Sequence, residues 1–322
     1  MRTLRIAGAP RREGAAGSLI CDCLARRAQQ LSNATNTAPP IILIIAGFDP
    51  SCGAGVAADL KTVAAHNCYG VAAVTALTVQ STLGVKTVYL PPSANLRAQI
   101  EALAEDIQIA AVKIGMLGNR ANAHAVAEML DQFKWPNVVL DPVIHSTSGT
   151  ELTDPSGAKY IRDELMKRTH LITPNVAEAS HLLGMEIPDL AAMEVAARAL
   201  VERGANAALV KGGHMEKPVD VLFDGTELLA LGGEKVRSES THGSGCTLSS
   251  AIASQLSLGK PLREAVLLAK VYVTKAIEHG YPIGKGSGPL NHFFRTQAEP
   301  AHRGVHADEL HTTHAPAESS NR

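Results

Sequence analysis

The stretch Thr241-His242-Gly243-Ser244-Gly245-Cys246-Thr247 is rich in glycine and runs directly into residues 248–253, an apolar segment typical of a helix. Gly243 and Gly245 lack a Cβ, so the backbone can adopt unusual dihedral angles and approach a ligand closely. The first turn of a helix has N–H groups without intrahelical partners and carries the positive end of the helix dipole. The sequence therefore predicts an anion pocket for a phosphate or a transferring phosphoryl group, with the thiol of Cys246 inside it.

Before this loop, short apolar runs alternate with segments of helical periodicity. Nearly continuous runs rich in β-branched residues indicate parallel strands buried on both faces. The runs are residues 41–46, 71–79, 111–114, 138–140, 171–173 and 207–210. The helical segments are residues 55–66, 93–106, 120–133, 155–168, 176–184, 190–203, 246–257 and 261–279. Residues 219–223 and 227–231 flank Asp224-Gly225 and predict a hairpin. This order predicts a doubly wound α/β fold, a mostly parallel sheet with helices on both faces.

The composition favours a cytoplasmic enzyme. The chain has 322 residues, 45% of them hydrophobic, and a net charge of −1, so it can bury a sizeable core and has no excess positive charge for nucleic acid. No apolar run approaches the roughly 20 residues of a transmembrane helix, so we expect no membrane partner. The five cysteines are odd in number and scattered, which argues against a disulfide framework and for a reducing compartment.

Both ends differ from the middle of the chain. Residues 1–39 are arginine-rich and poor in acidic residues, which is typical of a disordered extension or a targeting segment. From Arg295 onward the chain has few large apolar residues, so residues 295–322 are expected to be a disordered tail. Residues 40–294 remain as the folded domain.

The first predicted strand is followed by Gly47 and a second glycine-rich segment that ends at Asp59. The segment contains G-x-G-x-x-A, but no acidic residue follows the next strand, which ends at Gln80, so a dinucleotide-binding fold is disfavoured. No G-x-x-x-x-G-K-[ST] motif occurs, which excludes a P-loop. A turn that brings the backbone close to a small ligand remains. Asp59 is either a solvated helix residue or a ligand for a substrate amine or hydroxyl.

Polar residues also follow four other strands. The carboxyl ends of parallel strands meet at one edge of a sheet, where ligands bind. Asn175 and Glu178 have the spacing of a helix capping box, and Glu178 can alternatively order water around Mg²⁺ held by phosphates. Lys113 and Lys211 are either charges that reach solvent or cations over a phosphate. The residues at these strand ends are Lys113, Met116, Asp141, Val143, Asn175, Glu178 and Lys211.

Taken in order, these segments closely resemble the hydroxymethylpyrimidine/phosphomethylpyrimidine kinases, the thiamine-pathway branch of the ribokinase-like kinases. The matching motifs are G-x-D-P-S-x-G-A-G-x-x-A-D-L-K, T-A-L-x-x-Q, K-I-G-M-L, V-L-D-P-V, L-I-T-P-N-x-x-E-A, K-G-G-H and T-H-G-[ST]-G-C-T. The resemblance covers residues 41–294 and implies a ribokinase-like fold, ATP with Mg²⁺, and a homodimer. It also implies phosphorylation of 4-amino-5-hydroxymethyl-2-methylpyrimidine and then of its monophosphate to the diphosphate.

The resemblance also implies a role for each matching residue. Asp59 and Gln80 correspond to the pair that reads the pyrimidine edge, while Gly47, Met116 and Val143 line the substrate pocket. The catalytic anion hole corresponds to Gly243, Ser244, Gly245 and Cys246. The nucleotide-phosphate positions correspond to Asn175, Lys211 and Thr241, and the magnesium positions to Asp141 and Glu178. Two residues depart from the family pattern. Cys52 replaces a glycine, and His145 follows Ile144 where the family more often has a methionine and a small residue.

Phosphoryl transfer requires only a limited catalytic role of Cys246. Phosphoryl transfer relies mainly on positioning and charge stabilisation, so no strong base is needed. A helix N-terminus lowers the pKa of a thiol, and we therefore expect Cys246 to orient or deprotonate the substrate hydroxyl. Three alternatives are a pyridoxal kinase, a sugar kinase, which would have aspartate at position 246, and a pyrimidine-binding protein without catalysis.

Overall fold

The fold is built on one mixed sheet of nine strands. A computed structural model describes residues 38–146, 149–213, 218–236 and 238–296. The strands are β1 Ile41–Phe48, β2 Tyr69–Ser81, β3 Gly84–Tyr89, β4 Ala111–Ile114, β5 Val138–Leu140, β6 Leu171–Ile172, β7 Ala208–Gly212, β8 Val219–Phe223 and β9 Leu228–Gly232. They lie in the order β3-β2-β1-β4-β5-β6-β7-β8-β9. Strands β2, β1 and β4–β7 are parallel, whereas β3, β8 and β9 are antiparallel. The predicted doubly wound architecture and the predicted hairpin, β8–β9, are confirmed.

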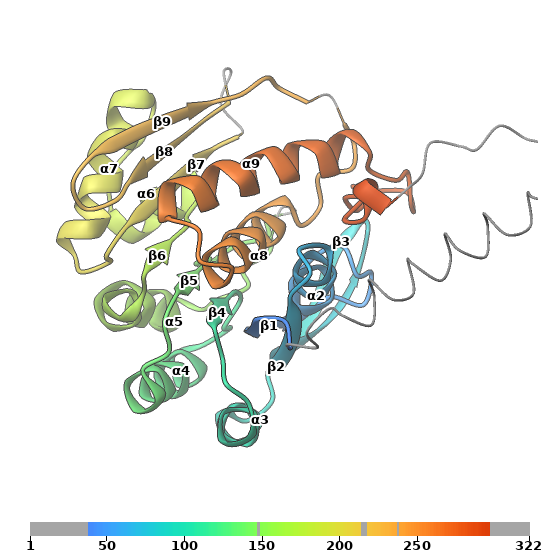
Figure 1. Ribbon diagram of the computed structural model, residues 1–322, viewed down its shortest axis with the longest axis vertical. Helices are drawn as coiled ribbons and strands as arrows, with labels where there is room; N and C mark the ends of the chain where they lie inside the picture. The colour runs from blue at the N-terminus through green and yellow to red at the C-terminus, as the bar shows by residue number, and fades with distance from the viewer. Residues whose placement is uncertain (1–37, 147–148, 214–217, 237, 297–322) are drawn as a thin grey trace, which may run out of the picture. The chain divides into compact units, whose positions relative to one another are not determined.

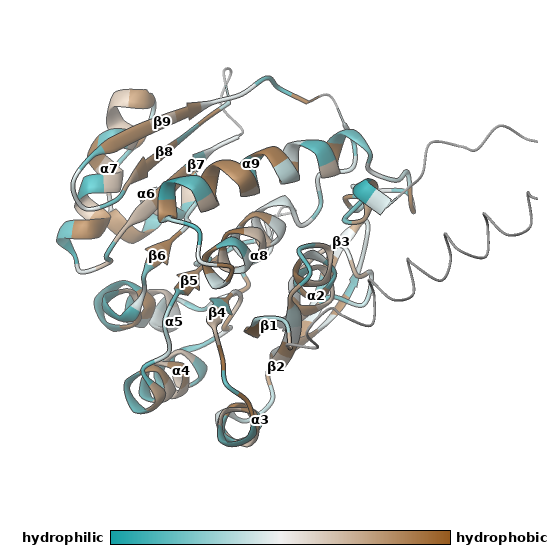
Figure 2. Ribbon diagram, in the orientation of Figure 1, coloured by the Kyte–Doolittle hydropathy of each residue, from teal (hydrophilic) through white to brown (hydrophobic). Residues whose placement is uncertain are grey.

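Helices cover both faces of the sheet (Figure 1). They are α2 Gly55–Ala65, α3 Ser93–Asp106, α4 Arg120–Phe133, α5 Pro155–Tyr160, α6 Val176–Leu183, α7 Leu190–Glu202, α8 Ser244–Ser257 and α9 Leu262–Glu278. One apolar core packs α3–α7 on one face, and a second packs α2, α8 and α9 on the other. The central strands are accordingly coloured hydrophobic in Figure 2, while the helices carry alternating hydrophobic and hydrophilic residues.

Capping residues explain why several helices begin where the sequence predicts. The side chains of Asn119, Asp154, Asn175 and Asp189 each accept a hydrogen bond from an N–H of the first turn. Such caps satisfy N–H groups that have no intrahelical acceptor. Gly184 ends α6 with a φ of 68°, a left-handed conformation that suits glycine.

Two elements differ from the prediction. Strand β3 was not predicted, because it follows β2 after a two-residue turn and several of its residues are exposed, which leaves little apolar pattern. The predicted helix 155–168 is continuous only as far as Tyr160 and then becomes a π-helical turn, Ile161–Leu165, and a 3₁₀ turn, Met166–Arg168.

The two ends of the chain lie outside the described residues. The predicted extension falls almost wholly in residues 1–37 and the predicted tail in residues 297–322, so both remain predictions, as does the domain boundary. In the ranges that the structure describes, no helix is long and apolar enough to cross a membrane.

Candidate active site

The anion pocket predicted from the sequence lies at the start of α8. Gly243 precedes the helix with a φ of 84°, and a Cβ at this position would lie 1.9 Å from the carbonyl oxygen of Gly53. Only glycine therefore lets this loop pack on the loop after β1. The amide of Ser244 donates to the carbonyl of Thr241, 3.2 Å away. Within the described part of the chain, the amides of Gly245 and Cys246 have no acceptor and can bind an anion.

A buried ion pair lies beside these amides. Lys211 Nζ donates to Asp141 Oδ1 over 2.7 Å, and Thr173 Oγ1 lies 3.3 Å from the same oxygen. A Cβ on Gly245 would be 3.1 Å from Lys211 Nζ, so the lysine lies directly over the start of the helix. Burial opposes the charge of Lys211, but Asp141 and Glu178 raise its pKa above the ordinary value, so it remains a cation. The alternative that Lys211 simply reaches solvent is disfavoured.

Asp59 and Lys113 form a second ion pair, which interacts electrostatically with Cys246. Both side chains are fully buried; Lys113 Nζ donates to Asp59 Oδ2 over 2.7 Å, and Ser250 Oγ donates to Asp59 Oδ1 over 2.8 Å. The alternatives of a solvated Asp59 and a solvent-reaching Lys113 are therefore wrong. Burial is the largest influence on both groups: it raises the pKa of Asp59, whereas the carboxylate of Asp59 keeps the pKa of Lys113 above its usual value.

Cys246 lies among these charges, and its pKa contradicts the expectation from the sequence. Burial raises the pKa of the Cys246 thiol to about 11, although Lys113 acts in the opposite direction. The nearby carboxylates of Asp59 and Asp141 raise it further, whereas the backbone N–H of Gly55 stabilises the thiolate. The neutral thiol is the form present at physiological pH, so Cys246 is suited to orient a hydroxyl and not to deprotonate it.

Asn175 and Glu178 form the capping box at the start of α6. Asn175 Oδ1 accepts from the Glu178 amide over 2.9 Å, and the Asn175 amide donates to Glu178 Oε2 over 2.8 Å. The amide of Ile144 also bonds to Glu178, so the carboxylate ties the loop after β5 to α6. Burial raises the pKa of Glu178 to about 7. Glu178 thus has a structural role, and its predicted role with magnesium remains a prediction.

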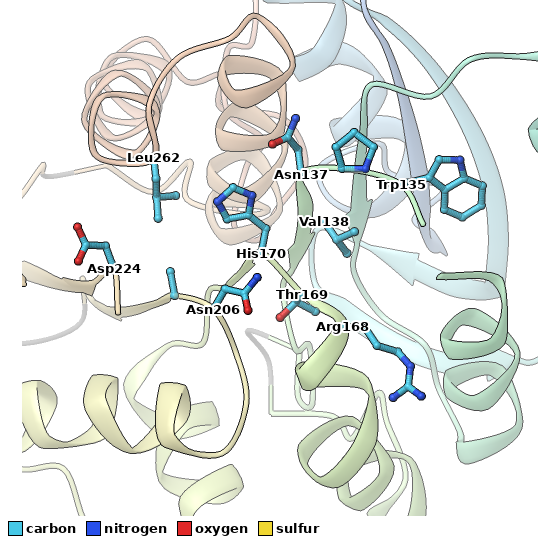
Figure 3. Close-up of a pocket in the computed structure, with 11 residues that line it drawn as sticks. Trp135, Asn137, Val138, Arg168, Thr169, His170, Asn206, Asp224 and Leu262 are labelled. Carbon is cyan, nitrogen blue, oxygen red and sulfur yellow. The ribbon is translucent and has the colours of Figure 1, made fainter. Parts of the chain in front are cut away.

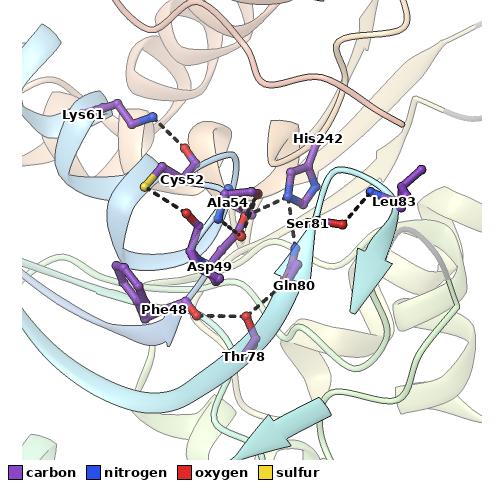
Figure 4. Close-up of polar contacts among 12 residues, drawn as sticks. Phe48, Asp49, Cys52, Ala54, Lys61, Thr78, Gln80, Ser81, Leu83 and His242 are labelled. Carbon is purple, nitrogen blue, oxygen red and sulfur yellow. Dashed lines mark hydrogen bonds and ion pairs between the residues drawn. The ribbon is translucent and has the colours of Figure 1, made fainter. Parts of the chain in front are cut away.

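A chain of polar residues from three segments lies beside the loop that precedes α8 (Figure 4). His242 Nε2 lies 2.9 Å from Asp49 Oδ2 and 3.2 Å from Gln80 Nε2. A carboxylate only accepts hydrogen bonds, so the single hydrogen on His242 Nε2 donates to Asp49. That nitrogen then cannot accept from Gln80. The amide of Gln80 therefore keeps its hydrogens for another acceptor, and its predicted role in substrate binding remains a prediction.

The predicted pocket-lining residues lie at the ends of neighbouring strands. A Cβ on Gly47 would be 3.0 Å from the Met116 sulfur, so the absence of a side chain at position 47 makes room for Met116. The carbonyl of Met116 accepts from Thr75 Oγ1 over 2.6 Å, which fixes the loop after β4. Val143 is half-buried in the loop after β5, and its carbonyl accepts from Thr153 Oγ1. The structure thus brings Gly47 and Met116 into contact, while Val143 lies in a different loop.

Some functional candidates were missed and one is placed differently. Asp49 and His242 were not predicted, although both lie inside the glycine-rich motifs, where a polar side chain at a strand end is itself a signal. Ser250, the partner of Asp59, was missed because a serine within an apolar helical segment gives no sequence signal for a functional role. Thr241 Oγ1 lies 3.4 Å from Ser287 Oγ, so this side chain faces the C-terminal segment and its predicted phosphate contact remains a prediction.

The described residues fit a magnesium nucleotide better than a protein-held metal. No group of three or more His, Cys, Asp or Glu side chains in the described ranges could hold a metal ion alone. Mg²⁺ usually keeps several waters and binds one or two carboxylates together with substrate phosphates. Asp141 Oδ2 has no hydrogen-bond partner in the described structure and faces the start of α8, so it is the carboxylate oxygen best placed for such an ion.

Comparison with known proteins agrees with this geometry. Residues 49–291 match the family described as phosphomethylpyrimidine kinase. The chain belongs to this family. It is 42% identical over 260 residues to the hydroxymethylpyrimidine/phosphomethylpyrimidine kinase of Rhizobium meliloti, covering 79% of this chain and 97% of that protein. It is also 41% identical to the thiamine biosynthesis bifunctional protein of Geobacter sulfurreducens, and there the match spans 80% of this chain but only 53% of the relative.

A solved structure with the same fold is that of a pyridoxal kinase from Bacillus subtilis in complex with ADP. It is 34% identical, with a TM-score of 0.73 over 79% of this chain and 98% of that chain. The likeness confirms the ribokinase-like fold predicted from the sequence, and a nucleotide binds to this relative.

Proposed function

We propose that this kinase transfers the γ-phosphoryl group of ATP first to 4-amino-5-hydroxymethyl-2-methylpyrimidine and then to the resulting monophosphate, as a step of thiamine biosynthesis. One observation carries the proposal. The free amides at the start of α8 lie in the same loop as His242, which contacts Gln80. The free amides and a side chain that can pair with an aminopyrimidine therefore lie on either side of His242.

Each residue has a distinct part in the proposed reaction. The free amide hydrogens of Gln80 donate to an acceptor on the pyrimidine ring, and Met116 packs against the ring from the loop after β4. The thiol of Cys246 orients the hydroxymethyl oxygen. The amides of Gly245 and Cys246 donate to the oxygens of the phosphoryl group in transfer, where negative charge is concentrated. Lys211 adds a positive charge at the same position.

Magnesium and ATP belong to the proposal. Mg²⁺ neutralises charge on the nucleotide phosphates when it is bound. Asp141 and Lys211 hold each other in place, so the carboxylate is oriented before the nucleotide arrives. Asn175 lies beside Lys211 through a parallel bridge between their segments and can extend the same polar surface toward the phosphates.

The function is tested by an ATP-to-ADP coupled assay that compares hydroxymethylpyrimidine, its monophosphate and pyridoxal. Turnover of both pyrimidines with little turnover of pyridoxal supports the proposal. Turnover of pyridoxal alone would contradict the substrate assignment and favour the second candidate, a pyridoxal kinase, which the likeness to the B. subtilis structure supports. The variant Gln80→Ala tests the assignment of the pyrimidine substrates. We expect it to raise KM for the pyrimidines by about 3- to 10-fold through loss of a hydrogen bond.

We include a homodimer in the proposal because β2 and β3 expose an apolar face. Leu77 and Val79 are 45% and 58% exposed and lie on the opposite face of β2 from Thr78 and Gln80. Tyr89 on β3, which pairs with Leu77, is 60% exposed. Sedimentation measurements on Val79→Lys test this: the variant should be monomeric, while Val195→Lys, an equally exposed valine on α7, should remain dimeric. A cytoplasmic location is part of the same proposal and is tested by cell fractionation.

A further inference from the structure

A buried carboxylate lies on the strand next to Lys211 and has no part in the reaction proposed above. Asp220 is the residue of β8 directly opposite Lys211 of β7. Directly opposite residues of two paired strands share one face of the sheet. The neighbouring pair on this face, Leu209 and Leu222, packs in the core with α8 and α9. Asp220 therefore faces the same helix layer as Lys211.

Both oxygens of the Asp220 carboxylate have partners. Oδ1 accepts from the backbone amide of Gly212 over 3.0 Å, and Oδ2 accepts from Lys270 Nζ over 2.5 Å. The side chain of Asp220 is 10% exposed, and that of Lys270, in α9, is 20% exposed. A buried carboxylate needs such a partner to keep its charge. Gly212 immediately follows Lys211, so Asp220 holds the backbone next to the lysine while α9 supplies the compensating charge.

The backbone at the end of β7 is held on both sides. The amide of Lys211 donates to the carbonyl of Pro174, after β6, over 2.8 Å. On the side of β8, a Cβ on Gly212 would lie 2.2 Å from the carbonyl oxygen of Val219, so the two strands approach closely here. These contacts determine where the Lys211 side chain begins, and hence how its ammonium group reaches Asp141 and the start of α8.

A second ion pair joins β8 and α9 at the opposite edge of the sheet. Asp224 follows β8, and its Oδ2 accepts from Arg263 Nε of α9 over 2.7 Å. Figure 3 shows Asp224 beside a hollow at the amino ends of β5, β6 and β7, whereas the active site lies at their carboxyl ends. Both ion pairs attach α9 to β8, but only that of Asp220 is next to Lys211. The pair of Asp224 and Arg263 is therefore a matched control for the attachment of α9.

We propose that Asp220 is a positioning residue for Lys211. The inference rests on the proposed function, in which Lys211 contacts a phosphate group of ATP. Asp220 accepts from the amide of Gly212 and fixes the end of β7, which directs Lys211 toward the start of α8 before the nucleotide binds. Loss of the acceptor lets the end of β7 move and weakens the contact between Lys211 and the phosphate.

Binding of AMP-PCP with Mg²⁺, measured by isothermal titration calorimetry on the full-length protein, tests the inference without the pyrimidine substrate. Asp220→Ala removes the acceptor and should raise Kd by about 3- to 10-fold. Asp220→Asn keeps an oxygen for the Gly212 amide and should restore most of the affinity. Arg263→Met breaks the ion pair at the other edge and should bind as the wild type does. Melting temperatures show that each variant is folded.

A double-mutant cycle shows whether Asp220 acts through Lys211. In a Lys211→Met background, Asp220→Ala should cause no further loss of affinity, because the group that it positions is absent. Equal Kd values for the wild type and Asp220→Ala, or the same loss with and without Lys211, would overturn this inference alone. A wild type that binds no AMP-PCP would contradict the proposed function and this inference together.

Discussion

The chemical state of Cys246 follows from its surroundings and not from its place on a helix. Burial raises its pKa to about 11, so the thiol should resist alkylation at neutral pH in the free protein. We expect the rate of carbamidomethylation at Cys246, followed by peptide mass spectrometry, to rise with a midpoint well above the value of about 8.5 for a free thiol. The same peptide from denatured protein serves as the control. A midpoint at or below 8.5 would show that the helix dipole lowers the pKa of Cys246 more than burial raises it.

The protonation state of Cys246 also determines the expected effect of its substitution on catalysis. If the neutral thiol orients the substrate hydroxyl, Cys246→Ser retains a group that can do so and should keep kcat within about tenfold of the wild type, or about 1.4 kcal/mol. Cys246→Ala lacks this group and should lose more. Equal kcat values for the two variants and the wild type would make the thiol incidental.

Cys52 replaces a glycine of the family pattern, and this replacement lowers the stability of the fold. Its φ of 58° lies in the left-handed region, which costs roughly 1–2 kcal/mol for a residue with a Cβ. Glycine would remove that strain but loses about 0.5–1 kcal/mol through the flexibility of the unfolded chain. We therefore expect Cys52→Gly to stabilise the fold by about 0.5–1 kcal/mol, measured by urea denaturation. Cys52→Ala keeps the Cβ and is the matched control; equal gains in both variants would mean that strain is not the cause.

At the scale of elements, the start of α8 depends on one glycine. Gly243→Ala would place a Cβ 1.9 Å from the Gly53 carbonyl and should displace the anion loop, lowering kcat by at least about 100-fold. Gly259, just after the C-terminal end of the same helix, has a similar φ of 81° but nothing within 4 Å of a Cβ. Gly259→Ala should cost about 1–2 kcal/mol of stability and leave kcat unchanged. A similar loss of activity in both variants would show that helix stability, and not the loop contact, is responsible.

The C-terminal segment that packs on α8 and α9 makes stability depend on pH. His292 is almost fully buried: its carbonyl accepts from the Tyr272 hydroxyl over 2.7 Å, and its Nε2 lies 3.2 Å from Thr247 Oγ1. Burial lowers the pKa of His292 to about 4, and the charge of Lys61 acts in the same direction. An unfolded histidine binds a proton near pH 6.5, so the stabilisation is complete above about pH 6.5 and is lost as the pH falls to about 4.

This shift corresponds to about 3 kcal/mol over that pH range. Carboxylates titrate in the same range, so the test is a difference between proteins. We expect His292→Gln to lose less stability than the wild type between pH 6.5 and 4 in urea denaturation, and His181→Gln, an exposed control, to follow the wild type. Parallel curves for His292→Gln and the wild type would contradict the assignment.

At the scale of the whole molecule, the sequence predicts the fold because its signals are local. Buried parallel strands leave continuous apolar runs, and helix caps such as Asn119 and Asp154 mark where helices begin. Strand β3 lacks such a signal, because its stability comes from pairing with β2 and not from its own pattern. The charge state of the site could not be predicted in the same way. The raised pKa of Cys246 depends on burial between segments far apart in the sequence. The hydrogen bonds from Lys113 and Ser250 to Asp59 join segments that are equally distant.

Two successive phosphorylations at one site would be visible directly in a ³¹P NMR time course. Hydroxymethylpyrimidine, ATP and Mg²⁺ are incubated with the full-length protein, with Gly243→Ala as the inactive control. We expect a monophosphate resonance that rises and then declines as a diphosphate pair appears, and neither signal with the variant. Accumulation of the monophosphate alone, or no pyrimidine phosphate at all, would contradict the proposed two-step reaction.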